Sequence, residues 1–290
     1  MAIAVKRARR VSLHAFLVGV SAIWLFPLAW AVYEALRPIR DTTLNGYLSL
    51  PHEPLTFVNF TDAWTNAEIP RFYLNTLFVA VPGVLLTLLV ASMLAFAISQ
   101  FSWRFNLLVL MIFTAGNLLP PQVIIIPLYW LYLNIPVPID WLSDNGLLYD
   151  QYIGIILIHV VFQTGFATFV LSNYMRTITR EITESALVDG ANVLRIWWSV
   201  ILPLCRPALA AMGTLLFTFM YNDFFWALVL MKSGDKRPIT SALNNLQGAF
   251  FTNYNLVAAG ALLAAVPPIL VYIALQKHFV RGLTLGATKG

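Results

Sequence analysis

Six long apolar stretches constrain this chain more than any other feature. A helix needs about 20 mostly apolar residues to cross about 30 Å of hydrocarbon. The stretches span residues 11–36, 74–98, 105–133, 153–174, 207–231 and 256–276. None shows the alternation of a barrel strand, and backbone groups in lipid must pair within their own segment. Only 11% of residues are charged, against about 25% in soluble domains. The sequence therefore predicts an all-α membrane protein with six transmembrane helices.

Residues 11–36 also fit a second interpretation, a secretory signal peptide. Basic residues precede the stretch, and Ala29-Trp30-Ala31 resembles a cleavage site. The apolar run is longer than the 7 to 15 residues usual in such peptides. We therefore expect a retained helix.

The distribution of basic residues predicts the orientation. With the N-terminus inside, the inner segments hold 12 of the 18 Lys and Arg residues, as the positive-inside rule requires. Residues 1–10 and 277–290 are then cytoplasmic tails. On a membrane chain the net charge of +5 records this bias, so we expect contact with membrane lipid and no nucleic acid partner.

Sequence motifs for catalysis and metal binding are absent. No Gly is followed by Lys, which excludes the phosphate-binding loop of P-loop ATPases. H-E-x-x-H and G-x-S-x-G are missing, the four His residues are scattered, and Cys205 is the single cysteine. We therefore expect no catalytic residue and no metal site in this chain, which leaves transport, signalling or scaffolding.

The inner segment 175–206 is the longest cytoplasmic loop and reads as a short helix, a turn and a second helical piece. Gly190 can adopt a positive φ and end the first helix, and Asp189 can accept hydrogen bonds beyond the turn. Pro203 should end the second piece because it lacks a backbone donor. Two interpretations remain open from the residues alone: a hairpin that docks in a partner's groove, or an interfacial helix held on the headgroups by Trp197 and Trp198.

The same loop resembles the "EAA" loop of ABC importer permeases, whose pattern is E-A-A-x-x-D-G-A, a spacer, and L-P-L-x-x-P. Residues 184–191 read E-S-A-L-V-D-G-A, and L-P-L-C-R-P follows at 202–207. The resemblance implies a role in coupling to an ATPase for eight residues: Glu181, Glu184, Ser185, Ala186, Asp189, Gly190, Ala191 and Pro203.

The similarity extends along the chain to carbohydrate permeases of the maltose type, specifically the smaller six-helix subunit. Further matching segments are Thr56 to Phe60, Asn75-Thr76, Pro121 to Tyr129, Tyr221-Asn222-Asp223 and the tail Arg281 to Gly290. The resemblance implies a single permease domain over residues 1–290, with the type I ABC importer permease fold and both termini cytoplasmic.

This resemblance also implies partners and a function. The chain would import a sugar or oligosaccharide across the inner or plasma membrane of a prokaryote by alternating access. It would work with a second permease subunit, two cytoplasmic ATPase subunits that bind ATP and Mg, and an extracytoplasmic sugar-binding protein, and would hold no cofactor itself. One alternative is a secondary transporter, which would show intramembrane ion-coupling carboxylates or internal repeats. Another is an ABC permease for an amino acid or glycerol phosphate, which generally lacks the tail motif.

Polar residues inside the apolar stretches are candidates for the substrate pathway. Asp223 is the only carboxylate well inside a stretch and costs about 2.5 to 3.5 kcal/mol there, so it either shapes the pathway or makes a structural hydrogen bond. Hydroxyl and amide groups suit a neutral sugar, although Thr and Asn in membrane helices often bond to a nearby backbone. The pathway candidates are Asn117, Gln122, His159, Gln163, Thr218, Tyr221, Asn222 and Asp223.

The prolines and the last outer loop give two further expectations. Pro120, Pro121 and Pro127 predict a bend in the helix over residues 105–133. By resemblance, the outer loop 232–255 faces the binding protein through Asn244, Asn245 and Gln247, while a solvated loop is the other interpretation.

Overall fold

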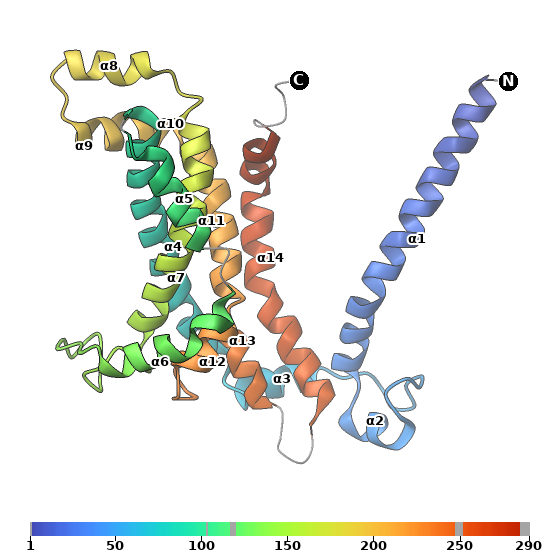
Figure 1. The fold of residues 1–290 in the computed structure, drawn as a ribbon. Helices are drawn as coiled ribbons and strands as arrows, with labels where there is room; N and C mark the ends of the chain where they lie inside the picture. The colour runs from blue at the N-terminus through green and yellow to red at the C-terminus, as the bar shows by residue number, and fades with distance from the viewer. Residues whose placement is uncertain (1, 103, 117–119, 247–251, 285–290) are drawn as a thin grey trace. The chain divides into compact units, whose positions relative to one another are not determined.

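The computed structural model describes the backbone of residues 2–102, 104–116, 120–246 and 252–284, and the side chains of these residues except 2–9, 244, 245 and 277–284. Helices provide the regular secondary structure of the described chain (Figure 1), together with an isolated antiparallel bridge between Pro136 and Leu147. The expectation of an all-helical chain is confirmed for these residues.

The chain forms two compact units. The first comprises Met1–Pro70 and Leu243–Ala265, and the second comprises Arg71–Ala242 and Val266–Gly290. The last helix, α14 (Tyr254–Thr284), contributes residues to both units.

Four helices in the described residues are long and apolar enough to cross a membrane. They are Arg10–Leu36 within α1 (Ala2–Leu36), α4 (Ile69–Gln100), α7 (Tyr152–Met175) and Tyr254–Gln276 within α14. Two bent helix pairs raise the number to six if each pair is one span. The pairs are α5 (Asn106–Gly116) with η1 (Pro121–Ile124) and α6 (Ile125–Asn134), and Val193–Leu204 with α11 (Arg206–Tyr221).

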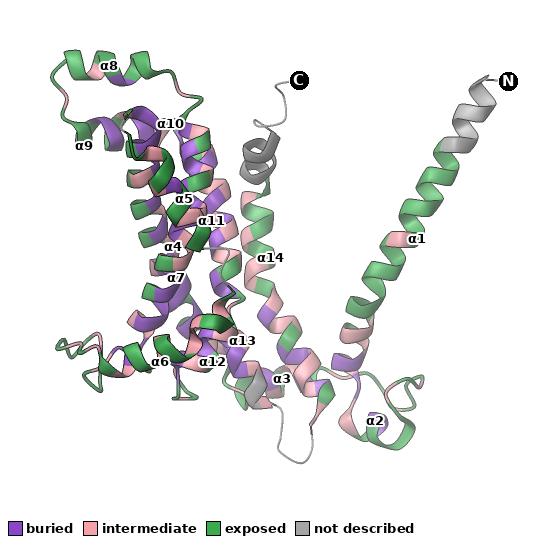
Figure 2. Cartoon of the chain, viewed as in Figure 1, coloured by how far each residue is buried: buried purple, intermediate pink, exposed green. Residues whose placement is uncertain are grey.

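The first unit contains α1, α2 (Ile39–Asn45), α3 (Val58–Thr65), η3 (Leu243–Leu246) and the beginning of α14. Figure 2 shows α1 exposed along most of its described length, which suits an apolar helix that faces lipid or another protein. The polar end of this unit is built around the fully buried side chain of Arg37.

Arg37 organises a buried polar cluster at the end of α1. Its guanidinium lies 2.8 Å from an Asp41 carboxylate oxygen and 3.3 Å from a Glu34 oxygen. The Asn59 amide donates to the carbonyl oxygens of Ala35 and Arg37 at 2.9 and 2.7 Å. The Asn255 amide donates to the Glu34 carbonyl at 2.9 Å. The charged groups therefore have the partners that a buried ion pair requires.

The second unit contains the remaining helices around α7. Besides those given above, they are α8 (Arg180–Val188), α9 (Val193–Ile196), η2 (Trp197–Ile201), α10 (Leu202–Leu204), α12 (Phe225–Leu230) and α13 (Ile239–Ala242). Helix α7 contacts α5, α11 and α12. Buried alanines such as Ala91, Ala95 and Ala167 let the helix backbones approach closely, as is common between membrane helices.

The prediction of one continuous helix over residues 207–231 is wrong. Helix α11 ends at Tyr221 and α12 begins at Phe225. The Asp223 carboxylate accepts hydrogen bonds from the backbone N–H groups of Trp226 and Ala227, each at 3.2 Å. A short acidic side chain that satisfies the first N–H groups of a new helix favours a break over continuation.

The stretch over residues 105–133 is also divided. Helix α5 ends at Gly116, Pro120 lies at the N-cap of η1, and α6 continues to Asn134. The expected interruption by Pro120 and Pro121 is present, whereas Pro127 lies inside the first turn of α6, where a missing N–H costs little. Asn117 lies outside the described residues.

Candidate functional site

Residues 175–206 form the expected hairpin at one end of the second unit (Figure 1). Its first helix, α8, exposes Glu181, Glu184 and Ser185. The Ser185 hydroxyl donates to the Glu181 carbonyl at 2.6 Å, so it is used within the helix. The opposite face packs inward, with Ala186 and Ala191 against the core of the second unit. The helix therefore presents an acidic face outward from an apolar base.

The turn after α8 depends on Gly190. Its φ of +81° lies in the left-handed region that favours glycine. The Gly190 N–H bonds to the Leu187 carbonyl and the Ala191 N–H bonds to the Ala186 carbonyl, both at 3.0 Å. This pair of bonds is the Schellman motif, which satisfies the last carbonyls of a helix. The expected end of the helix at Gly190 is confirmed.

The next helix begins at a cap that sequence reasoning missed. The Asn192 side chain accepts a hydrogen bond from the Arg195 N–H at 2.8 Å, which is the usual N-cap arrangement. Asp189 was expected to accept hydrogen bonds beyond the turn, but the side chain that caps α9 is Asn192. The signal is present in the sequence, because Asn192 stands immediately before Val193 and Leu194, and Asn directly before an apolar run is a typical N-cap.

The second arm does not stop at Pro203. It continues through η2, which is a π-helix, and α10 to Leu204, and the bend of 81° follows before α11. The Leu202 N–H bonds to the Trp197 carbonyl, five residues back. Pro203 is tolerated because it occupies the first turn of α10, and the break falls at Cys205, just before Pro207 in the first turn of α11. Trp197 is buried and Trp198 is 62% exposed.

A buried chain of hydrogen bonds fastens α8 to two long helices. The Thr183 hydroxyl donates to the Gln100 side-chain oxygen at 2.9 Å, and the Gln100 amide donates to the Met175 carbonyl at 3.0 Å. Thr183, Gln100 and Met175 are 3%, 7% and 0% exposed. The chain joins the middle of α8 directly to the last residue of α4 and, through Gln100, to the last residue of α7. Sequence reasoning missed Thr183 and Gln100.

Asp223 and His159 lie together among the helices of the second unit. The His159 Nε2 and an Asp223 carboxylate oxygen are 3.5 Å apart, with both side chains nearly buried. The Asp223 carboxylate also caps α12, and its backbone carbonyl accepts a hydrogen bond from the Thr240 hydroxyl. The alternative of a structural hydrogen bond at Asp223 therefore has direct support, and His159 is its neighbour.

The polar face of α11 bonds mainly to its own backbone. The Thr214 hydroxyl donates to the Ala210 carbonyl at 2.8 Å, and the Thr218 hydroxyl donates to the Thr214 carbonyl at 2.9 Å. The Asn222 amide donates to the Thr218 carbonyl at 2.9 Å. These donors are already satisfied, while the Asn222 side-chain oxygen lies at an exposed end of the helix. The sequence left two interpretations open for these side chains, a contact with sugar or a bond to the nearby backbone. The structure shows the bond to the backbone.

The other pathway candidates do not gather at one point. Gln163 is half-buried one turn after His159 in α7, Tyr221 is buried at the end of α11, and Gln122 is exposed in η1. Asn244 and Asn245 lie in η3, but their side chains are outside the described set. Gln247 and Asn117 fall outside the described residues entirely.

Side chains from the segment before α7 hold the segment that follows α12. One Asp150 carboxylate oxygen accepts hydrogen bonds from the backbone N–H groups of Lys232 and Ser233, both at 2.9 Å. The Lys236 ammonium lies 2.6 Å from Asp144. Hydrogen bonds from Lys236 and Gln151 hold the pKa of Asp144 below its usual value. The segment is therefore anchored at several points while Lys232, Gly234 and Asp235 stay exposed, and a contact with the binding protein stays a prediction.

A second anchor for this segment comes from α4. The Asn75 amide donates to the carbonyl oxygens of Asp235 and Arg237 at 2.7 and 3.0 Å, and its oxygen accepts from the Tyr152 hydroxyl at 2.7 Å. Arg71 pairs with Asp235 at 2.9 Å. The Asn75-Thr76 motif noted in the sequence therefore positions the segment after α12, since the Thr76 hydroxyl also accepts a hydrogen bond from the Ile239 N–H at 2.8 Å.

Comparison with known protein families decides what this helical arrangement belongs to. Residues 83–285 match the family described as binding-protein-dependent transport system inner membrane component. The chain belongs to this family. The matched residues include the hairpin with α8, the pair of His159 and Asp223, and the second half of α4.

Relatives of this transport component are similar over most of its length. The alpha-glucoside transport system permease protein AglG of Rhizobium meliloti is 36% identical over 81% of this chain and 60% of its own length. The diacetylchitobiose uptake system permease protein NgcG of Streptomyces coelicolor is 28% identical over 94% of this chain and 87% of its own.

A solved structure shares the fold. The crystal structure of a bacterial ABC transporter involved in the import of the acidic polysaccharide alginate contains a chain that is 25% identical. The match covers 92% of this chain and 95% of that chain, with a TM-score of 0.75. The expected resemblance to ABC importer permeases is therefore confirmed at the level of the family and the fold.

Proposed function

We propose that this chain is a membrane-spanning subunit of an ATP-driven importer that carries a sugar or oligosaccharide into a prokaryotic cell by alternating access. Family membership supports the transport role. Two relatives named for alpha-glucoside and diacetylchitobiose transport support the substrate class. In this arrangement the chain has six spans, with each bent helix pair as one span, and both termini lie in the cytoplasm together with α8.

The hydrogen-bond chain from α8 to α4 and α7 is the observation that carries the mechanism. The exposed face with Glu181 and Glu184 enters a cleft of an ATPase subunit, and Gly190 fixes the turn that shapes the tip. When the ATPase subunits close on ATP, α8 moves with them. Thr183 and Gln100 pass the displacement to the ends of α4 and α7. The packing of the helices then changes between two arrangements.

The partners follow from this mechanism. A second permease completes the pathway, two ATPase subunits hold ATP and Mg, and an extracytoplasmic sugar-binding protein delivers the substrate to the outer face. Asn244, Asn245 and Gln247 face that protein, and Gln122, His159, Gln163, Thr218, Tyr221, Asn222 and Asp223 contribute to the pathway with Asn117. A secondary transporter is less well supported, since Asp223 already accepts two backbone hydrogen bonds.

Cross-linking tests the docking of α8. Cys205 is the only cysteine in the sequence and is buried, so Glu184→Cys introduces a single accessible thiol. We expect it to cross-link to the ATPase subunit in the assembled complex, whereas Asp140→Cys in an exposed loop at the other end of the unit should not. Ion-driven sugar uptake by the reconstituted chain without any ATPase would overturn the proposal.

A further inference from the structure

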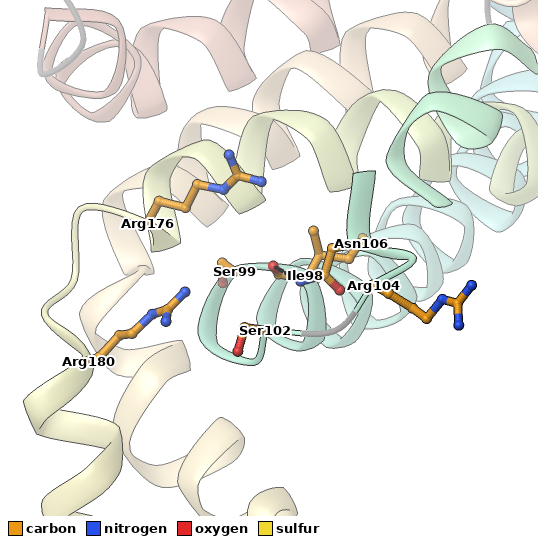
Figure 3. Close-up of a pocket in the computed structure, with 7 residues that line it drawn as sticks. All are labelled: Ile98, Ser99, Ser102, Arg104, Asn106, Arg176 and Arg180. Atoms are coloured by element: carbon orange, nitrogen blue, oxygen red, sulfur yellow. Dashed lines mark hydrogen bonds between the residues drawn. The ribbon is translucent and has the colours of Figure 1, made fainter. Parts of the chain in front are cut away.

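A basic pocket lies in the second unit where α4 ends, close to the first turn of α8 (Figure 3). Its volume is about 540 Å³, and its polar lining comes from Ser99, Ser102, Arg104, Asn106, Arg176 and Arg180. In Figure 3 the side chains of Arg176 and Arg180 extend toward Ser99, in the last turn of α4, and Ser102, just after it, whereas Arg104 points away from them. The guanidinium groups of Arg176 and Arg180 thus face the opening, while that of Arg104 lies over the Phe105 ring, 4.8 Å from its centroid.

The pocket carries positive charge without a matching carboxylate. Among the described residues that line it, none is acidic. The salt bridges between described residues do not include Arg104, Arg176 or Arg180. Guanidinium groups bind phosphate through two parallel N–H donors and hold it more specifically than an ammonium group does. The pocket is therefore suited to a phosphate group.

Asn106 adds a second requirement. Its amide N–H groups donate to the carbonyl oxygens of Ile98 and Phe101 at 3.0 and 2.7 Å. These two bonds fix the orientation of the amide, and the side-chain oxygen is left buried without a partner among the described residues. An unpaired buried acceptor is costly, and a phosphate alone does not satisfy it. A ligand that joins a phosphate to a hydroxyl donor satisfies both the arginines and Asn106.

We propose that this pocket binds a phosphate group with a nearby hydroxyl, supplied by the headgroup of an anionic phospholipid such as phosphatidylglycerol or by a soluble phosphate compound. A separate apolar cleft of about 390 Å³, lined by Met93, Phe96, Phe101 and Trp197, shares no lining residue with the basic pocket, so the headgroup chemistry alone carries the proposal. Basic pockets between membrane helices on the cytoplasmic side bind anionic headgroups in this way. The site goes beyond the proposed transport function and assigns a ligand to residues outside the pathway.

Native mass spectrometry of the full chain in a zwitterionic detergent tests the site. The chain is titrated with dihexanoyl phosphatidylglycerol, dihexanoyl phosphatidylcholine or inorganic phosphate. We expect phosphatidylglycerol to bind more tightly than phosphatidylcholine. Removal of one arginine charge should weaken phosphatidylglycerol binding about fivefold, so the double variant Arg176→Gln/Arg180→Gln should weaken it roughly 25-fold. Arg176→Lys/Arg180→Lys should retain part of the affinity.

Arg206→Gln is the matched control, because Arg206 is an exposed arginine at the last residue of the hairpin and does not line the pocket. It should change the affinity less than twofold. Binding of inorganic phosphate without phosphatidylglycerol supports the site and assigns it to a soluble phosphate compound. Unchanged phosphatidylglycerol binding in the folded double variant, or an equal loss in Arg206→Gln, overturns the proposal.

Discussion

The Thr183 hydroxyl donates to the Gln100 side-chain oxygen across 2.9 Å, with both side chains buried. This contact joins the middle of α8 to the end of α4, and the Gln100 amide continues it to the end of α7. The apolar contacts of Ala186 and Ala191 hold the hairpin on the core, but the hydrogen bonds fix where it attaches along α4. The contact therefore gives the exposed acidic face of α8 a hydrogen-bonded connection to both long helices.

Thr183→Val should uncouple ATP hydrolysis from transport. The substitution keeps the shape and removes the hydroxyl, which leaves the Gln100 oxygen buried and unpaired at a cost of about 1 to 3 kcal/mol. We expect sugar uptake by the reconstituted complex to fall about five- to tenfold while ATP hydrolysis continues. Thr177→Val is the control, since the exposed Thr177 hydroxyl donates only to the nearby Tyr174 carbonyl. Uptake equal to wild type would show that the bond does not transmit motion.

Gly190→Ala should weaken the hairpin without preventing membrane insertion. At a φ of +81° an L side chain costs about 1 to 2 kcal/mol, and the two bonds of the Schellman motif should loosen. The expected result is a severalfold loss of uptake and of Glu184→Cys cross-linking to the ATPase subunit. Gly19→Ala, within α1 and with no atom near the added Cβ, should have no effect. A full-activity Gly190→Ala complex at normal abundance would contradict the expected role of the turn.

Asp223→Ala should lower the thermal stability of the protein. The substitution removes the cap of α12, which costs about 0.5 to 2 kcal/mol. Asp223→Asn keeps one acceptor and should cost less. The stability of both variants is measured as the thermal unfolding midpoint in detergent. Asn222→Ala is the control, because the Asn222 amide donates to the nearby Thr218 carbonyl of α11. A normal midpoint in Asp223→Ala combined with lost uptake would favour a role in the pathway instead.

Arg37→Met should be the most destabilising of these substitutions. It leaves Asp41 and Glu34 buried without their cation, and breaking a buried ion pair typically costs about 3 to 5 kcal/mol. Arg40→Met provides a matched control three residues away. The Arg40 side chain is 78% exposed and lies 3.5 Å from Glu53, so its loss should change stability by less than about 1 kcal/mol. Thermal unfolding in detergent measures both, and equal midpoints would rule out a structural role for the cluster.

The stability of the first unit should depend on pH through Asp41. Burial alone would raise the pKa of this carboxyl, but hydrogen bonds from Arg37, Asn45 and the His52 N–H outweigh burial and hold it below the usual value. Because the pKa of Asp41 is lower in the folded protein than in the unfolded chain, its ionisation stabilises the folded state. This stabilisation is complete above the unfolded pKa of about 3.9 and is lost as the pH falls through the lower pKa of the folded protein. Unfolding midpoints measured from pH 6 down to pH 3 should therefore fall, and should fall less steeply in Asp41→Asn.

Sequence reasoning reached the helical class and the hairpin because both depend on local signals. Apolar length predicts helices in a membrane, and Gly190 marks the end of α8. The break at residues 222–224 was missed because apolar length does not reveal a side chain that caps a new helix. Thr183, Gln100 and Asn192 were missed because their bonds arise from packing or from short caps within a loop. Asn59 and Asn75 were noticed as motif residues, but only the coordinates show that they hold backbone carbonyls.

The bond from Asn255 to the Glu34 carbonyl links residues 221 positions apart in the sequence. During biosynthesis, the first apolar helix therefore enters the membrane long before the amide that completes its polar end has been made. Until the ribosome has passed residue 255, the Arg37 cluster lacks one of its members. A nascent chain that stalls or is truncated earlier leaves the carbonyl and the carboxylate of Glu34 without the Asn255 amide, so the polar end of its first helix is complete only when the last helix has begun.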